Sequence, residues 1–222
     1  MPSFVYIQRI IKYLSLAALA FFSFLMLQII LRYVTFNTDV AFLQIKQDYI
    51  NNHFWLSAFY IHVFSSLIAL LAGFTQFSHV IRTRHPSIHR FVGRIYVFDI
   101  LCITGPAGFI MAFYANGGLT SRLAFAVLSI LWWCFTFKAL QYARAHDFAK
   151  HRAFVLRSFA LTLSAVTLRL WKMFFAHYFE LPPMDIYRIV AWLGFVPNLL
   201  LVEYWLRVVK PQPQPSAPPR NF

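Results

Sequence analysis

The sequence predicts an all-α integral membrane protein with six transmembrane helices. Of its 222 residues 60% are hydrophobic and only 12% are charged, whereas soluble domains carry about 25% charged residues. Six apolar runs of about 20 or more residues are each long enough for a helix to cross a hydrocarbon core of roughly 30 Å. These spans are expected at about 13–34, 54–80, 91–114, 119–142, 151–178 and 186–208. Residues 1–210 should therefore form one transmembrane domain.

The first apolar run follows a short basic segment with Arg9 and Lys12, as in a signal peptide. A cleaved signal has an apolar stretch of only about 7 to 15 residues, so this longer run is predicted to remain as the first span. The connection at 35–53 is the longest. Apolar residues such as Val40 and Leu43 are interspersed with polar ones there, which indicates a short amphipathic helix lying on the membrane.

The second span carries His62 about two turns inside its start, followed by small and polar residues at helical spacing. Such a stripe marks a face turned toward other helices. The third span contains Asp99 and is interrupted by the pair Gly105-Pro106. The tripeptide Asn116-Gly117-Gly118 then predicts a tight turn before the fourth span.

The fifth span is expected to be one continuous helix from His151 to about Tyr178. Because 18 residues make five full turns of an α-helix, His151 and Arg169 should point the same way, with Ser158 and Thr162 between them. After the sixth span the chain is rich in proline, glutamine and serine, so residues 211–222 are predicted to be a disordered tail.

Ionisable residues inside the spans suggest two ion pairs. Asp99 and Arg157 lie at similar depth, and because neither charge is tolerable alone, they are predicted to form a buried salt bridge. The alternative for the two residues is a proton path. Glu203, near the end of the sixth span, is expected either to face cytoplasmic water or to pair with Arg207 one turn later.

Lysines and arginines gather on the side of the predicted membrane that would hold both termini. The positive-inside rule then places the N- and C-termini in the cytoplasm. The net charge of +13 is accordingly interpreted as topology charge beside anionic lipid rather than as a nucleic-acid surface. We expect a multi-pass protein of the bacterial cytoplasmic (inner) membrane whose partners are the lipid bilayer, possible further subunits of a membrane complex, and no nucleic acid.

The histidines separate into two groups under this topology. Those on the cytoplasmic side are His79, His85, His89, His146 and His151, and those toward the outer side are His53, His62 and His177. Histidines at one depth on neighbouring helices can supply two axial ligands to haem b, and arginines can neutralise its propionates.

His89 and His151 are the preferred inner ligands because each opens a span and is followed directly by an arginine. Arg94 and Arg152 are the candidate propionate or headgroup partners. The alternatives for this pair are contact with lipid headgroups, a metal site, or a proton relay.

His62 and Arg169 form a second candidate site toward the outer side. Ionisable groups within spans are costly and usually face a bundle interior or a cavity. The pair could bind an anionic headgroup, a quinone carbonyl or a haem propionate. The structural alternative is that Arg169 satisfies carbonyl or hydroxyl groups at a helix contact.

Several of these residues form a pattern that resembles a family of bacterial predicted membrane proteins of unknown function, over about residues 62–169. The pattern consists of His62, Arg82-x-Arg84, His89-Arg90-x-x-Gly93-Arg94-x-Tyr96-Val97, His151-Arg152, Arg157-Ser158-Phe159-Ala160-Leu161-Thr162 and Leu168-Arg169. The architecture is also similar to that of cytochrome b561-type proteins, and this resemblance implies haem held by histidine pairs. The sequence departs from that type because the outer side offers only His177 as a second span histidine beside His62.

The leading hypothesis for function is a membrane redox protein with b-type haem and/or quinone-linked electron transfer. The first alternative is a non-catalytic accessory or assembly subunit of a larger membrane complex. The second is a small transporter or lipid-binding membrane protein. No phosphate-binding glycine loop, nucleophile elbow or zinc-protease motif is present in the sequence, and no catalytic residue is assigned.

Overall fold

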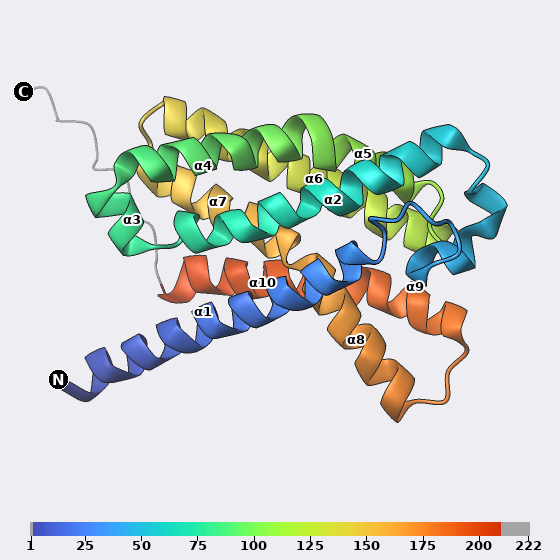
Figure 1. The fold of residues 1–222 in the computed structure, drawn as a ribbon. Coiled ribbons are helices and arrows are strands. Elements are labelled where there is room, and N and C mark those ends of the chain that lie inside the picture. The colour runs from blue at the N-terminus through green and yellow to red at the C-terminus, as the bar shows by residue number, and fades with distance from the viewer. Residues whose placement is uncertain (1, 210–222) are drawn as a thin grey trace, which may run out of the picture.

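The computed structural model describes residues 2–209, which contain helices and connections but no strand (Figure 1). The elements are α1 (Pro2–Leu31), η1 (Ala41–Tyr49), α2 (His53–Gln76), α3 (His79–Arg84), α4 (Pro86–Phe98), η2 (Asp99–Thr104), α5 (Gly105–Ala112), α6 (Leu119–Arg144), α7 (Phe148–Thr162), α8 (Ser164–Tyr178), α9 (Pro183–Leu193), α10 (Val196–Tyr204) and η3 (Trp205–Val209). Five helices are long and apolar enough to cross a membrane, or six if the bent pair α7 and α8 forms one span. The prediction of an all-helical, multi-span protein is confirmed. The predicted tail at 211–222 lies outside the described residues.

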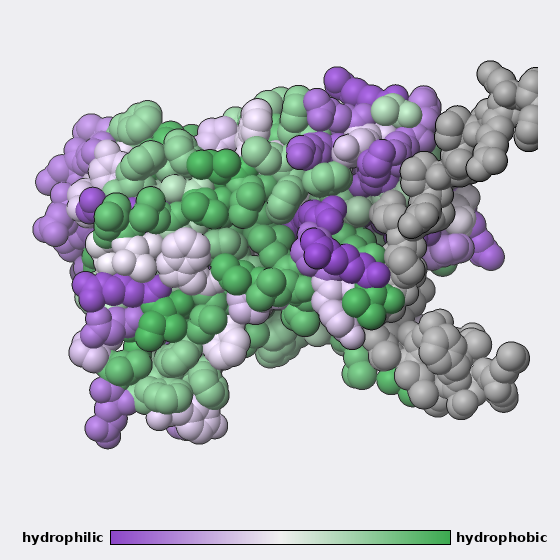
Figure 2. All heavy atoms as spheres, turned by 180° about the vertical axis from the view of Figure 1, so that it is seen from behind, coloured by the Kyte–Doolittle hydropathy of each residue, from purple (hydrophilic) through white to green (hydrophobic). Residues whose placement is uncertain are grey.

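The spans run back and forth along one long axis (Figure 1). The start of α1, helix α3 and the end of α10 lie at one end of this axis, and η1 and the start of α9 lie at the other. We call these the α3 end and the η1 end. Figure 2 shows a largely apolar body between polar ends, as a bilayer-spanning protein requires. The assignment of the α3 end to the cytoplasm stays a prediction.

Small residues fill the centre of the bundle, and large apolar residues cover its outside. Ala69 and Ala124 are fully buried, whereas Phe91 and Leu201 are well exposed. Lipid solvates large apolar side chains as well as a protein core does, so helices associate by close packing of small residues. Gly73 shows this directly, because a methyl group at this position would collide with the Phe159 ring on α7.

The third span contains a π-helical turn, η2, where the sequence places the Gly105-Pro106 break. Pro106 has no N–H to donate to the carbonyl four residues earlier, and its ring would clash with that carbonyl. The chain widens to an i→i−5 bond instead, in which the Gly105 N–H donates to the Ile100 carbonyl. The predicted break in the third span is therefore a π-helical turn.

The fifth span is broken, and the prediction of one continuous helix is wrong. Helix α7 ends at Thr162, α8 starts at Ser164, and the two are bent by 40°. The Ser164 hydroxyl donates to the Leu161 carbonyl at 2.5 Å, and Thr167 donates to Leu163 at 3.2 Å. Such side-chain bonds to preceding carbonyls bend helices. Consequently α8 leaves the bundle at an angle (Figure 1), and His151 and Arg169 do not share one straight face.

The predicted short helix in the 35–53 connection is present as the 3₁₀ helix η1, but it packs on the bundle. Leu43 is fully buried in a cluster with Tyr33, Trp55 and Phe59. The buried Lys46 ammonium donates to the Tyr114 carbonyl and, at 2.6 Å, to Asn116 Oδ1. The helix thus closes the η1 end by holding the connection between α5 and α6.

The stability of this closure is expected to rise with pH through Lys46. Burial, reinforced by the positive charge of Arg122, lowers the pKa of Lys46 from 10.5 to about 8. Between these two values the unfolded chain binds this proton more tightly than the folded chain. The free energy of unfolding should therefore increase from pH 8 to pH 10.5, on the order of 3 kcal/mol. Thermal unfolding across this range, with Lys46→Met as the control, measures the effect, and equal pH slopes for both proteins would contradict it.

Candidate functional site

His151 is held at the α3 end by a defined helix start. Asp147 caps α7 by accepting a hydrogen bond from the Lys150 N–H at 3.0 Å. One turn later, His151 Nδ1 lies 2.8 Å from the Ala139 carbonyl on α6. Because a carbonyl only accepts, Nδ1 carries the hydrogen, and in the neutral ring Nε2 is the atom left to act as a ligand. A backbone bond of this kind typically orients metal-binding histidines.

His89 comes to the same place from α4, which begins at Pro86. Its ring is half-buried and interacts electrostatically with His151. Its Nδ1 is buried without a hydrogen-bond partner in the described part of the chain. His151 thus has its Nδ1 held by the backbone, whereas His89 has an unpartnered Nδ1. The prediction that His89 and His151 act as a pair of ligands stays a prediction.

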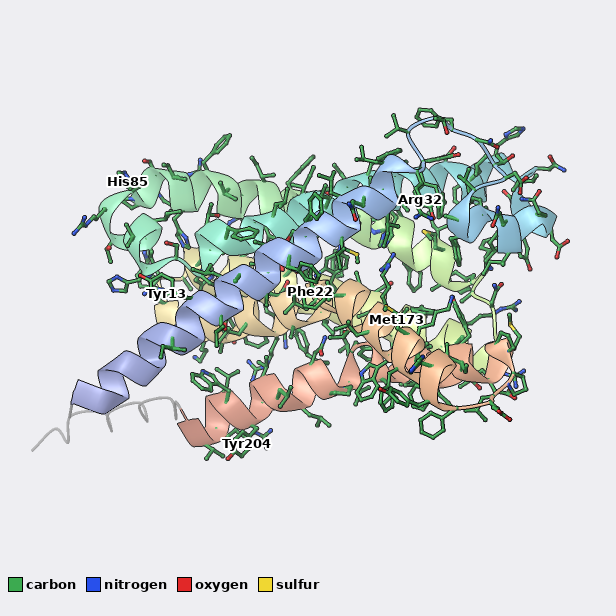
Figure 3. All side chains as sticks on the ribbon, turned by 60° about the horizontal axis from the view of Figure 1, so that its bottom comes forward. Tyr13, Phe22, Arg32, His85, Met173 and Tyr204 are labelled. Carbon is green, nitrogen blue, oxygen red and sulfur yellow. The ribbon has the colours of Figure 1, made fainter. Side chains whose placement is uncertain are left out.

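Arginines lie close to His89 and follow both histidines in the sequence. Arg82 and Arg90 interact electrostatically with His89, and both are exposed. Arg94 and Arg152 are also exposed and have no ion pair within residues 2–209. Figure 3 shows His85 at this same α3 end, far from Arg32 at the η1 end. The α3 end therefore offers positive charge to an anionic group.

Asp99 is buried in the middle of the bundle, and its predicted salt bridge with Arg157 is wrong. Its Oδ1 accepts a hydrogen bond of 2.7 Å from Thr104, and its Oδ2 is buried with no partner in the described part. Arg157 instead bonds Glu203 on α10, with Nε–Oε1 at 2.5 Å and Nη2–Oε2 at 3.0 Å. The predicted neighbour Arg207 lies 3.8 Å from Glu203 as a secondary contact.

His62 is linked to the π turn. Its Nδ1 lies 3.1 Å from the Thr104 carbonyl, and its ring packs on Gly108, where a methyl group would come within 3.0 Å of the ring. His62 interacts with Arg169 electrostatically, but no hydrogen bond joins them, and Arg169 donates to the Ala165 carbonyl at 2.6 Å. Arg169 has no acidic partner among residues 2–209. The structure thus brings this candidate pair near one another without direct contact.

A hydroxyl cluster next to Asp99 was missed by the sequence analysis. The Tyr96 hydroxyl lies 2.7 Å from Ser158 Oγ and 3.1 Å from Thr162 Oγ1. Trp132 Nε1 donates to Thr162 at 3.1 Å, and Thr136 lies 2.7 Å from Ser158. Every member is buried and paired, so the cluster joins α4, α6 and α7. The only signal in the sequence was the recurrence of small polar residues inside spans.

Two grooves open on the apolar surface, and neither is lined by His89 or His151. One of about 410 Å³ is lined by Tyr60, Ile61, Phe64, Ser65, Ile68 and Ile103. The other, about 280 Å³, is lined by Gly105, Pro106, Phe109, Ser129, Ile130 and Trp133. No three His, Cys, Asp or Glu side chains within residues 2–209 come together as a metal site.

The fold and the buried polar groups define a polytopic helical membrane protein with ionisable residues inside its bundle. Residues 59–206 match the family described as predicted membrane protein (DUF2306), and the chain belongs to this family of unknown function. No curated protein and no solved structure matches the chain. The family resemblance inferred from the sequence is confirmed, whereas the likeness to cytochrome b561 stays a prediction.

Proposed function

We propose that the protein is an electron-transfer protein of the bacterial inner membrane that binds b-type haem through His89 and His151. The observation that carries this proposal is the electrostatic interaction of two histidines from α4 and α7, of which His151 has Nδ1 held by the backbone and His89 has an unpartnered Nδ1. Two imidazoles from neighbouring helices are suitable axial ligands for haem iron. A pair of ligands suffices here, because the porphyrin supplies the other four.

The surrounding arginines fit this group. Arg94 and Arg152 are exposed and without ion pairs in the described chain, so they are available to the two propionates. When bound, haem supplies a one-electron iron couple. Arg82 and Arg90 add positive charge close to His89, which favours the less positive, reduced form. The chain itself therefore orients the ligands and adjusts the potential.

A lipid-soluble quinone is the electron partner that the bilayer location favours. His62 with Arg169 stays a candidate for a carbonyl or anionic group, because Arg169 has no acidic partner among the described residues. The π turn is a second candidate for the quinone site, because His62 contacts the Thr104 carbonyl there.

The purified protein from haem-replete cells is expected to show sharp reduced-minus-oxidised bands, at about one haem per chain by pyridine haemochrome. His89→Ala and His151→Ala should each lose most of this absorbance, because a single imidazole holds the iron weakly. His85→Ala is the matched control, since His85 is exposed at the same end of the bundle. A colourless wild-type protein, or full haem in both ligand variants, would overturn the proposal.

A further inference from the structure

Helix α3 is a short helix that buries none of its side chains in the bundle. Ser78 caps its start by accepting a hydrogen bond from the Ile81 N–H at 3.3 Å. It ends at His85, which precedes Pro86 and has φ −129° and ψ 59°, outside the helical region. A helix of six residues is too short to be stable on its own in water. The outer face of α3 is therefore open to contacts from outside the described chain.

Arginines without counter-ions lie on α3 and on the first turns of α4. Residues 79–98 contain no acidic residue. Arg82 on α3 and Arg90 on α4 are both exposed, and both act electrostatically on His89, so they lie close to its ring from two different helices. Neither guanidinium forms an ion pair within residues 2–209. Two cations near one another repel, and an anion between them replaces that repulsion by attraction.

The acidic residues at the α3 end are already engaged with other cations. Asp147 pairs with Lys150 at 2.9 Å, and Glu203 bonds Arg157 on α7. The η1 end has a different balance, because acidic residues lie in η1 and at the start of α9. An anion for Arg82 and Arg90 must therefore come from another molecule.

Exposed apolar side chains lie beside these arginines. Val80, Ile88 and Phe91 are 48%, 45% and 64% exposed. The apolar span that begins at Pro86 has 27 residues, so it is about 40 Å long, the thickness of a bilayer with its headgroup regions. Its first turns therefore lie at headgroup depth. A molecule that covers this surface needs an anionic group for the arginines and apolar chains for Ile88 and Phe91.

We propose that α3 and the first turns of α4 bind an anionic phospholipid, with its phosphate between Arg82 and Arg90 and its acyl chains against Ile88 and Phe91. Guanidinium groups suit this ligand because their planar N–H donors match phosphate oxygens. An acidic soluble protein also offers anions, but it would not cover apolar side chains that lie within the span. Combined basic and apolar surfaces of this kind are typical of protein segments at anionic membrane surfaces.

This inference is independent of the proposed function. Arg94 and Arg152, the candidate partners of the haem propionates, are not part of the lipid site, and lipid binding can be measured on coloured or colourless protein. A colourless protein that binds the lipid would remove the haem and keep the lipid site. A coloured protein without lipid preference would do the reverse.

The test is native mass spectrometry of the delipidated protein in a neutral detergent, titrated with phosphatidylglycerol or with phosphatidylcholine. We expect saturable binding of phosphatidylglycerol, about tenfold tighter than that of phosphatidylcholine. Arg82→Gln and Arg90→Gln should each weaken it about fivefold, since a basic residue near an anionic lipid surface contributes about 1 kcal/mol. An equal concentration of inorganic phosphate should not displace the lipid, because phosphate makes no apolar contact.

Arg144→Gln is the matched control, because Arg144 is exposed at the end of α6 and its replacement removes the same charge. It should leave the affinity nearly unchanged. Equal losses in Arg144→Gln and Arg90→Gln would mean that the lipid responds only to net charge, and this result would overturn the site. Equal affinity for the two lipids, or displacement by inorganic phosphate, would overturn the phospholipid as its occupant.

Hydrogen exchange locates the bound lipid on the chain. Phosphatidylglycerol should slow amide exchange in α3 severalfold, because the lipid supplies the contacts that this helix lacks. The double variant Arg82→Gln with Arg90→Gln should lose this protection, and exchange in η1 at the opposite end should not change. Protection of η1 instead of α3, or protection that survives in the double variant, would contradict the proposed position of the lipid.

Discussion

Replacing Gly105 with alanine is expected to destabilise the folded protein by about 2–3 kcal/mol, at the upper end of the range for overpacked sites. The added methyl group would collide with the Ile100 carbonyl. This oxygen belongs to the backbone, so no side-chain rotation relieves the clash, and the i→i−5 bond of the π turn must open. The apparent melting temperature in mild detergent, followed by circular dichroism, should fall by several degrees.

Gly93→Ala is the matched control for this change. It lies in the same span, but its methyl group would come 3.2 Å from Gln76 Oε1, the end of a flexible side chain that can move. We therefore expect a small change in melting temperature for Gly93→Ala and a large one for Gly105→Ala. Similar values for the two variants would show that the π turn is not the rigid element inferred here.

Gly105→Ala should also disturb the buried acid. Thr104 bonds both Asp99 and His62 only because the π turn brings these groups to one face. Opening the turn would rotate Asp99 away from Thr104 and separate Thr104 from Ser65, whose oxygens lie 2.6 Å apart. The stability of the bundle and the hydrogen bonds of Asp99 thus depend on the same backbone geometry.

Apolar length and proline chemistry were sufficient to predict the spans and the break in the third one. Both are local properties of the sequence. A long apolar run predicts a helix that crosses the bilayer, and Pro106 lacks a backbone N–H donor whatever surrounds the helix. The bend at Leu163 was not predictable in this way. The residues around it are individually acceptable in a helix, and the bend depends on several Ser and Thr bonds acting together.

The sequence did not predict which residues pair with the buried charged side chains. Asp99 and Arg157 have similar depth, but depth does not fix the direction in which each side chain faces around its helix. Asp99 bonds Thr104 within its own span, and Arg157 bonds Glu203 on α10, 46 residues away. The placement of His89 and His151 near the starts of α4 and α7 was easier to infer, because it follows from where each apolar run begins.

Changing Arg157 to methionine is expected to lower the free energy of unfolding by about 2 kcal/mol. The guanidinium and the Glu203 carboxylate form two bonds, and their side chains are only 19% and 31% exposed. Loss of a fully buried partner costs about 3–5 kcal/mol, and the partial exposure of Glu203, with Arg207 nearby, reduces that figure.

A double-mutant cycle separates this pair from general damage to the bundle. The variant Arg157→Met with Glu203→Met leaves no charge stranded, so it should be closer to the wild type than the sum of the single changes. Arg188 and Asp185 provide the control cycle, since this exposed pair within α9 should couple by only a few tenths of a kcal/mol. Additive effects at Arg157 and Glu203 would contradict the pairing.

The same variants should show which helices the ion pair stabilises. After the break at Leu163, α8 diverges from the bundle, so only α7 of the fifth span stays packed in it (Figure 1). The Arg157–Glu203 pair joins this half to α10. Hydrogen exchange in Arg157→Met is therefore expected to increase in α10 and to stay unchanged in η1 at the opposite end. An increase spread evenly over all spans would mean that the pair supports the whole fold rather than the contact of the last span.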